Sequence, residues 1–189
     1  DFPDFGRRQL KEAGVQQGDV VVAITEGGET PFVIGTAWQG LDVGAHVFFF
    51  YNNPTELLRR HVQRSREVIE EPRIGKLDLA TGPMAITGST RMQATTAELL
   101  VVGAAVETAI AQFLQENGVR MAEHAYASVS MAPGLPLTPQ STREYHRLFE
   151  RLLGQLSSPQ AVAGIARAVE LEEQLYRKHG LVTYLADSL

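Results

Sequence analysis

The sequence predicts an α/β fold, in which a parallel sheet with helices between its strands is followed by a segment that is helical alone. Two short runs rich in β-branched and aromatic residues, 19–25 and 45–51, are separated by one helix-length stretch. This spacing is typical of a βαβ unit, whose two strands are parallel and joined by a right-handed crossover. Beyond Gly118 the strand-like runs give way to helical periodicity.

The first run, DVVVAIT at 19–25, is continuously apolar and predicts a strand buried on both faces. After the loop 26–29, Thr30 suits an N-cap and Pro31 suits the first position of a helix. The second strand is expected over 45–51, after glycines that mark the end of the helix. The apolar face of the helix is predicted to consist of Phe32, Val33, Ala37 and Trp38.

The alternation continues with a helix from Asn53 and Pro54 to about Glu70, whose arginines predict a solvated charged surface rather than an anion site. A short strand is expected at 76–80. The polar loop 81–90 then precedes a long helix ending near Asn117. Because its middle is apolar nearly all round, this helix is predicted to be buried.

The C-terminal part predicts a linker and two amphipathic helices. Three prolines mark 126–139 as the linker, and residues 141–144 form a capping box that opens the first helix. Ser158 and Pro159 open the second helix. The apolar run 181–186 predicts a further strand.

Composition excludes several classes of protein. The 189 residues carry 17 Lys and Arg against 22 Asp and Glu, a net charge of −5 without basic runs, so we expect neither nucleic acid nor a membrane as partner. There is no cysteine, which excludes disulfides and thiolate metal sites and fits a cytoplasmic location. The five histidines lack metal-ligand spacing, and no nucleotide-binding motif is present, so we expect no metal and no cofactor.

Candidate binding residues lie in three polar loops at the carboxyl ends of the predicted strands, 25–30, 51–53 and 81–90, where open parallel sheets bind ligands. The strongest candidate is 87–91, TGSTR, which places hydroxyls, a glycine and an arginine at a helix N-terminus suited to an anion. An ordinary N-cap beside a surface arginine is the alternative. In 25–30, Gly27 and Gly28 permit close backbone approach, whereas Glu26 and Glu29 would repel phosphate. These glutamates would contact sugar hydroxyls, act in acid–base chemistry, or simply be solvated.

Two stretches carry a family resemblance. Residues 19–35, DVVVAITEGGETPFVIG, and 81–92, TGPMAITGSTRM, resemble the sugar isomerase (SIS) domain family. The second stretch is similar to the branch that contains N-acetylmuramic acid 6-phosphate etherase and the glucokinase regulatory protein. The similarity covers roughly residues 6–115, and the longer insertion before Thr81 resembles the regulatory protein more than the etherases.

The resemblance implies a flavodoxin-like parallel sheet of five strands that binds a phosphorylated sugar or amino sugar. This chain departs from the etherases at three positions. The etherases typically carry serine, arginine and lysine where this chain carries Gly27, Glu29 and Gln93, respectively. These departures argue against etherase-type phosphate binding. The ligand-binding residues that the resemblance implies are Thr25, Glu26, Gly27, Gly28, Thr30, Thr87, Gly88, Ser89, Thr90 and Arg91.

The resemblance also implies a division of the chain. Residues 1–118 would form the SIS domain without its first strand, 119–180 a helical connector, and 181–189 the start of a second SIS domain. The family's first phosphate loop and two catalytic acids would belong upstream of Asp1, so the piece alone is expected not to be a competent enzyme.

Three functions are therefore weighed. The preferred one is a phosphosugar-binding regulator similar to the glucokinase regulatory protein, with Ser89, Thr90 and Arg91 holding the ligand. The alternative is an enzyme, either a lyase that cleaves the lactyl ether of muramic acid 6-phosphate or an aldose–ketose isomerase. The third is a helix-mediated dimerisation module built on residues 140–180. A homo-oligomer is expected.

Overall fold

The computed structural model describes residues 2–84, 86, 89, 92–117 and 142–184. The chain divides into two compact units, Asp1–Gly103 and Ala104–Leu189, and each is described by itself. The boundary between the units falls inside a long helix. The predicted partition at 118 and 180 stays a prediction.

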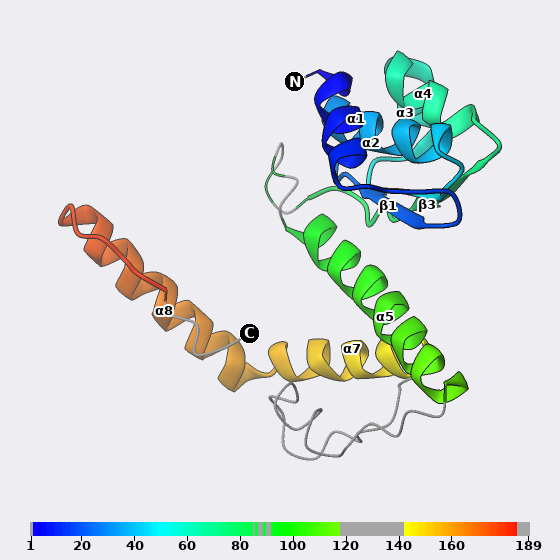
Figure 1. Ribbon diagram of the computed structural model, residues 1–189. Helices are drawn as coiled ribbons and strands as arrows, with labels where there is room; N and C mark the ends of the chain where they lie inside the picture. The colour runs from blue at the N-terminus through cyan, green and yellow to red at the C-terminus, as the bar shows by residue number, and fades with distance from the viewer. Residues whose placement is uncertain (1, 85, 87–88, 90–91, 118–141, 185–189) are drawn as a thin grey trace. The chain divides into compact units, whose positions relative to one another are not determined.

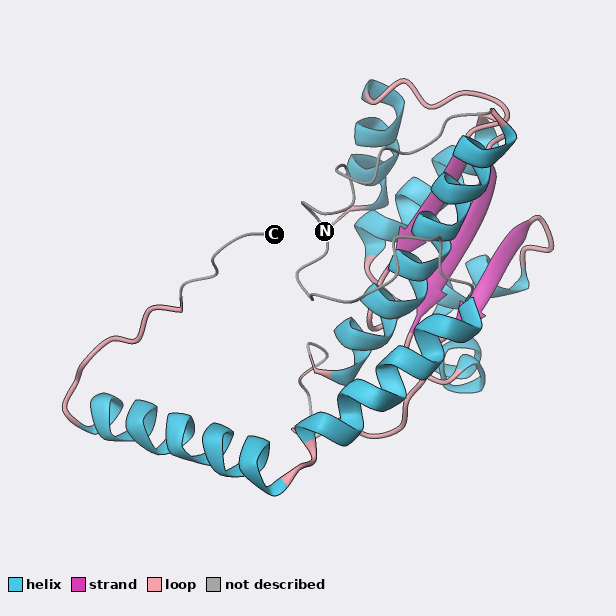
Figure 2. Ribbon diagram, turned by 90° about the horizontal axis from the view of Figure 1, so that it is seen from below, coloured by secondary structure: helices cyan, strands magenta, loops and turns pink. Residues whose placement is uncertain are grey.

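The first unit is built on a parallel sheet of three strands, β1 (Val20–Ile24), β2 (His46–Tyr51) and β3 (Ile74–Asp78), in the order β1-β2-β3 (Figures 1 and 2). Val20 lies opposite His46, and Val47 lies opposite Ile74. Helix α2 (Pro31–Asp42) is the crossover between β1 and β2. The predicted α/β class with a parallel sheet and a following helical segment is confirmed.

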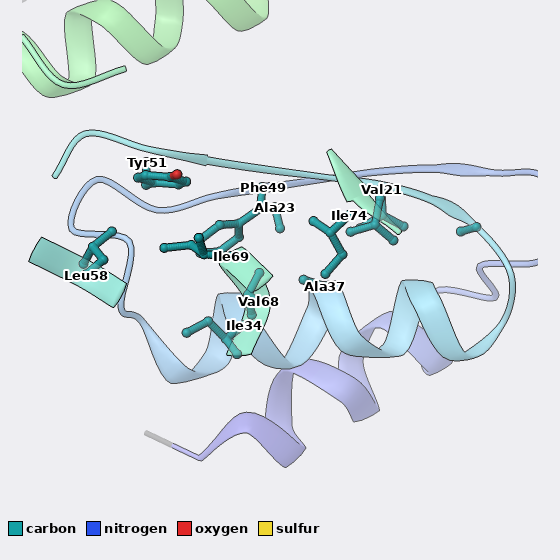
Figure 3. Close-up of a cluster of buried hydrophobic side chains, with 12 residues drawn as sticks. Val21, Ala23, Ile34, Ala37, Phe49, Tyr51, Leu58, Val68, Ile69 and Ile74 are labelled. Carbon is teal, nitrogen blue, oxygen red and sulfur yellow. The ribbon is translucent and has the colours of Figure 1, made fainter. Parts of the chain in front are cut away.

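One face of the sheet carries the core (Figure 3). Side chains of β1 and β2 point toward α2, and Phe49, Ile34 and Ala37 are fully buried between these elements. Helix α1 (Pro3–Glu12) packs on the outer side of α2. Sequence reasoning did not predict this helix, although Pro3 at its start and an Arg8–Glu12 pair one turn apart are local signals for it.

On the other face of the sheet Phe50 of β2 is buried, but the side chains of β1 are exposed in the described part of the chain, so the prediction of burial on both faces is wrong for β1. Its residues alternate between exposed and buried, and Val20 and Val22 are 62% and 39% exposed. A continuous apolar run identifies side chains that favour burial, but it does not reveal whether another element covers them.

The helix expected over 53–70 is two helices, α3 (Thr55–His61) and α4 (Gln63–Glu70). Val62 breaks it with an extended backbone, φ −123° and ψ 102°. Leu58 and Ser65, which lie on either side of the break, are both buried, whereas Leu57 is exposed. No glycine or proline marks the break, so the sequence pattern did not reveal it.

The long helix is α5 (Gln93–Glu116), and the prediction that it is buried is wrong. Leu99 and Phe113 are 70% and 63% exposed, and the described side chains that are buried, such as Ala94 and Ala104, are few. By length and composition alone, residues Gln93–Leu114 would suffice to cross a membrane, a property that core helices of other proteins share. The expectation of no membrane partner stays a prediction.

The second unit contains the rest of α5 together with α7 (Thr142–Leu156) and α8 (Pro159–Arg177). Ser158 caps α8 as predicted, since its side chain accepts a hydrogen bond from the Ala161 N–H at 3.3 Å. Residues 181–184 form no strand, contrary to the prediction for 181–186. The predicted linker 126–139 and Ser141 lie outside the described residues, as do 185–189.

Candidate functional site

The carboxyl ends of β1 and β2 lie side by side and carry the candidate site. The Thr25 N–H donates to the Phe50 carbonyl at 3.0 Å, and the Asn52 N–H donates to the Glu26 carbonyl at 3.0 Å. The parallel pairing thus continues one residue beyond each strand and holds the loop 25–30 against the start of the loop after β2. This is the edge of the sheet at which open α/β folds bind ligands.

Two threonines close the loop 25–30 on itself. The hydroxyls of Thr25 and Thr30 lie 2.9 Å apart and share a hydrogen bond. Thr30 occupies the N-cap position of α2 as predicted, but its side chain makes no capping bond, because the hydroxyl is engaged with Thr25. Thr25 is buried, so it orders the loop from inside.

Side chains from the following elements hold the backbone of this loop. The Asn53 amide donates to the Gly27 carbonyl at 2.9 Å, and the buried Ser65 hydroxyl donates to the Gly28 carbonyl at 2.7 Å. Arg64 donates through Nε to the Glu29 carbonyl at 2.6 Å. Three loop carbonyls are therefore satisfied by side chains, which fixes the loop conformation before any ligand arrives.

Gly28 shows why this loop needs glycine. Its φ of +73° lies in the left-handed region, and an added Cβ would come 2.5 Å from Leu58 Cδ1 and 3.1 Å from Tyr51 Cβ. The close approach is thus to the protein's own core. Gly27 has no such constraint, since a Cβ there would meet its nearest neighbour at 3.5 Å.

A cluster of acceptors, which we call the carboxylate cluster, joins the loop ends to α5. It consists of Glu26, Asn52, Thr95 and Glu98. The Thr95 hydroxyl donates to Glu26 Oε1, and Asn52 Nδ2 donates to Glu98 Oε1 at 2.7 Å. Thr95 and Glu98 are three residues apart on α5, so they lie on one helix face.

Part of the carboxylate cluster is buried, which is unusual for a side chain that can carry a charge. Asn52 and Glu98 are only 4% and 8% exposed. Burial raises the pKa of the Glu98 carboxyl, and the charge of Glu26 raises it further, against the opposing hydrogen bond from Asn52. Asn52 Oδ1 is buried and has no hydrogen-bond partner in the described part of the chain.

The structure brings together only part of the predicted site. Thr25, Glu26, Gly27, Gly28 and Thr30 share one rigid loop beside the carboxylate cluster. Ser89 is described and donates its N–H to the Ile86 carbonyl at 3.1 Å. Thr87, Gly88, Thr90 and Arg91 lie outside the described residues. Their role in binding stays a prediction.

Sequence reasoning placed the loop 51–53 at the ligand edge of the sheet but did not select Asn52 from it, and it missed Thr95 and Glu98. Asn52 follows a predicted strand directly, which was a usable signal, because polar residues at that position face the ligand edge of the sheet. Glu98 sits inside an apolar helix, where one carboxylate facing inward suggests a paired or functional group. No sequence pattern indicated that α5 would meet the loop after β1.

A hollow of about 450 Å³ lies beside β3 and is lined by Tyr51, Thr55, Asp78 and neighbouring side chains. Asp78 accepts hydrogen bonds from the Thr55 N–H at 3.0 Å and the Thr55 hydroxyl at 2.6 Å. Although burial favours its protonated form, these bonds and one from Ala80 lower the pKa of Asp78. Asp78 therefore serves to hold the start of α3, a structural role.

The arginines of α3 and α4 are largely engaged by the protein itself. Arg59 contacts Glu56 at 3.0 Å and Glu70 at 3.3 Å, while Arg66 donates to backbone carbonyls of α3. This agrees with the predicted charged helix surface. Among the residues described here, no group of three or more acidic or histidine side chains is placed to hold a metal ion.

The fold and the loops define an α/β domain whose candidate site lies at the carboxyl ends of parallel strands. No family model matches the chain. N-Acetylmuramic acid 6-phosphate etherase of Clostridium acetobutylicum is 35% identical over 102 residues, 54% of this chain and 30% of the relative. The etherase of Bacillus subtilis is 31% identical over 102 residues with the same coverage. That of Salinibacter ruber is 29% identical over 146 residues, 71% of this chain and 43% of the relative.

These matches confirm the resemblance to the etherase branch of the SIS-domain family that the motifs indicated. In these three comparisons the match spans less than half the length of the relative.

Proposed function

We propose that this chain binds a phosphorylated amino sugar at the carboxyl ends of β1 and β2, and that the protein acts as a sugar-phosphate lyase related to the etherases. The similarity to N-acetylmuramic acid 6-phosphate etherases carries this proposal. The rigid loop 25–30 supports it, since the loop lies at the edge where parallel sheets bind ligands.

The relatives favour the lyase over the regulator that the sequence motifs suggested first. The matched proteins are named as etherases of N-acetylmuramic acid 6-phosphate, an amino sugar that carries both a phosphate and an ether. An isomerase is less well supported for the same reason.

One observation favours the regulator as a second candidate. Where etherases carry an arginine and a lysine, this chain has Glu29 and Gln93. Glu29 is exposed, and Gln93 donates its side-chain amide to the Pro83 carbonyl at 2.9 Å. Two cations that would attract phosphate are therefore replaced by groups without positive charge, as expected of a protein that has changed its ligand or its chemistry.

Binding is tested by calorimetry of the purified protein with N-acetylmuramic acid 6-phosphate, glucosamine 6-phosphate and glucose 6-phosphate, with inorganic phosphate as a control for a bare anion site. Saturable heat with at least one sugar phosphate is expected. Absence of binding to all three sugars would contradict the proposal.

Chemistry is tested separately by measuring release of lactate from N-acetylmuramic acid 6-phosphate. Release supports the lyase, whereas binding without release supports the regulator only when the protein tested carries the two catalytic acids of the family. Interconversion of aldose and ketose phosphates in the same samples would support the isomerase. The proposed cytoplasmic location is tested by fractionating cells that produce the protein.

A further inference from the structure

The loop 25–30 carries two carboxylates and no cation of its own. Its sequence is TEGGET, and Glu29 is exposed. A phosphate monoester carries a charge of about −1.5 to −2 near neutral pH, so a sugar phosphate bound at this loop needs a positive charge from another element. Among the described residues, Arg64 of α4 is the one cationic side chain that bonds to the loop, through Nε to the Glu29 carbonyl at 2.6 Å.

Two consecutive residues of α4 hold the Arg64 guanidinium beside the loop. The Ser65 hydroxyl is buried and donates to the Gly28 carbonyl at 2.7 Å, which fixes this turn of α4 against the loop. The Arg64 Nε–H donates to the next carbonyl along the loop, that of Glu29. Because the side chain is already held at Nε, binding a ligand would remove less of its conformational freedom than binding by a free arginine, which favours affinity.

Most of the donor capacity of Arg64 is unused. A guanidinium has five N–H donors, and in the described part of the chain the contact of Arg64 is the one made by its Nε–H. Arg59, on the neighbouring helix, instead forms ion pairs with Glu56 at 3.0 Å and Glu70 at 3.3 Å. Arg64 is therefore placed at the loop without an acidic partner among the residues described.

The carboxylate of Glu29 does not occupy the free donors of Arg64. Glu29 Oε1 lies 3.8 Å from the position that a Cβ on Gly27 would take, so this carboxylate is turned back over its own loop. Arg64 is exposed, and an anion in solution can reach its terminal nitrogens. The loop thus presents a fixed, accessible guanidinium.

We propose that Arg64 binds the phosphate group of the sugar phosphate and supplies the positive charge that the loop 25–30 lacks. The inference rests on the proposed binding of a phosphorylated amino sugar and names a residue that recognises its phosphate. A guanidinium is protonated at every pH at which the protein is folded, and its planar fork donates two parallel hydrogen bonds to two phosphate oxygens. Arg64 thereby departs from the solvated surface that the sequence predicts for the arginines of this region.

The experiment measures, by calorimetry, the binding of N-acetylmuramic acid 6-phosphate, glucosamine 6-phosphate and glucose 6-phosphate to the parent protein and to Arg64→Gln. The variant should bind each sugar phosphate that the parent binds at least about tenfold more weakly, because it loses a charge-assisted contact. Equal affinities of variant and parent would overturn the inference and leave the proposed function intact. Failure of the parent to bind any of the three would overturn both.

Two further variants separate the charge of Arg64 from its bond to the loop. Arg64→Lys keeps the charge without the planar fork and should lose less affinity than Arg64→Gln. Equal losses in these two variants would overturn the inference, because Arg64 would then only tether the loop. Arg60→Gln removes the same charge from an exposed residue of α3 and should leave binding unchanged. A loss equal to that of Arg64→Gln would contradict the assignment, because it would reflect net charge alone.

A spectroscopic measurement on the parent protein decides the inference even if a variant fails to fold. The NMR signal of the Arg64 Nε–H should shift on titration with N-acetylmuramic acid 6-phosphate and stay in place with N-acetylmuramic acid, which has no phosphate. An unchanged signal at saturation with the sugar phosphate would overturn the contact. Equal shifts with the two ligands would also overturn it, because Arg64 would then respond to the sugar and not to the phosphate.

Discussion

Gly28 and Gly27 are neighbours in one loop, but only Gly28 lacks room for a Cβ. Alanine substitutions at the two positions therefore form a matched pair that tests the structure of the loop. Gly28→Ala forces a side chain onto a φ of +73° and against Leu58 and Tyr51. We expect a loss of about 1–3 kcal/mol in the free energy of unfolding. Gly27→Ala meets ordinary contact distances and should change stability by less than about 1 kcal/mol. Urea denaturation of both variants measures the difference, and equal losses would contradict the structural account of the loop.

Glu98 gives the stability a definite dependence on pH. Because burial raises its pKa above the ordinary 4.5, the folded chain binds the proton more tightly than the unfolded chain. The resulting stabilisation is present below pH 4.5 and is lost as the pH rises through the folded-state pKa.

The free energy of unfolding of the variant Glu98→Gln should therefore increase relative to that of the parent protein as the pH rises. We expect similar free energies of unfolding near about pH 4 and a more stable variant near about pH 7, since the amide cannot ionise. Denaturation at a series of pH values measures both proteins. A difference that does not change with pH would show that Glu98 titrates normally.

Residue-scale prediction worked where a local rule applied. The loop 25–30 was found because it follows a strand and contains two glycines, and Ser158 was found because a serine before proline opens a helix. Thr30 was correctly predicted at the N-cap position of α2, but its hydroxyl shares a hydrogen bond with Thr25 instead of capping the helix. Asn52 and Glu98 meet across 46 positions of sequence, and no local pattern records such a contact.

At the scale of elements, two glycines set how closely α1 and α2 approach. A Cβ on Gly6 would lie 1.9 Å from the Phe32 carbonyl oxygen, and one on Gly35 would lie 1.9 Å from the Pro3 carbonyl oxygen. Both contacts are with backbone, so no side chain can move aside. Each helix thus carries one glycine at the point where the other helix crosses it.

Gly35→Ala should separate the two helices and destabilise the sheet unit by about 1–3 kcal/mol. Gly103→Ala is the matched control, because Gly103 is also helical and a Cβ there meets nothing within 4 Å. Alanine is the better helix former, so this control should be neutral or stabilise by up to about 1 kcal/mol. Thermal denaturation followed by circular dichroism measures both, and a stabilising Gly35→Ala would show that the helices do not cross as described.

Elements with a strong period or clear end signals were predicted, and those governed by tertiary contacts were not. The strands β1 and β2 and the crossover α2 follow from apolar runs, Thr30 and Pro31. The break at Val62 was not predicted, because neither glycine nor proline marks it. The prediction that α5 is buried was wrong. Its apolar composition shows that the helix could be buried, but it does not show whether another element covers it.

At the scale of the whole molecule, the second unit leaves its apolar stripes uncovered in the described part of the chain. Helix α8 buries none of its residues, and Val162, Ile165 and Val169 are each more than half exposed. They recur at intervals of three and four residues, so they form one stripe along the helix, the pattern of a helix that packs against another. The expected homo-oligomer, in which such stripes would pack together, stays a prediction.

Ile165→Arg tests whether that stripe mediates self-association. An arginine in the middle of an apolar helix contact would be desolvated without a partner, which should weaken association by at least about tenfold. Ala163→Arg adds the same charge away from the stripe, on the same helix, and should leave association unchanged. Sedimentation equilibrium over a range of protein concentrations measures the three proteins. A parent protein that sediments as a monomer at every concentration would exclude the homo-oligomer, and equal weakening by both arginines would place the contact elsewhere.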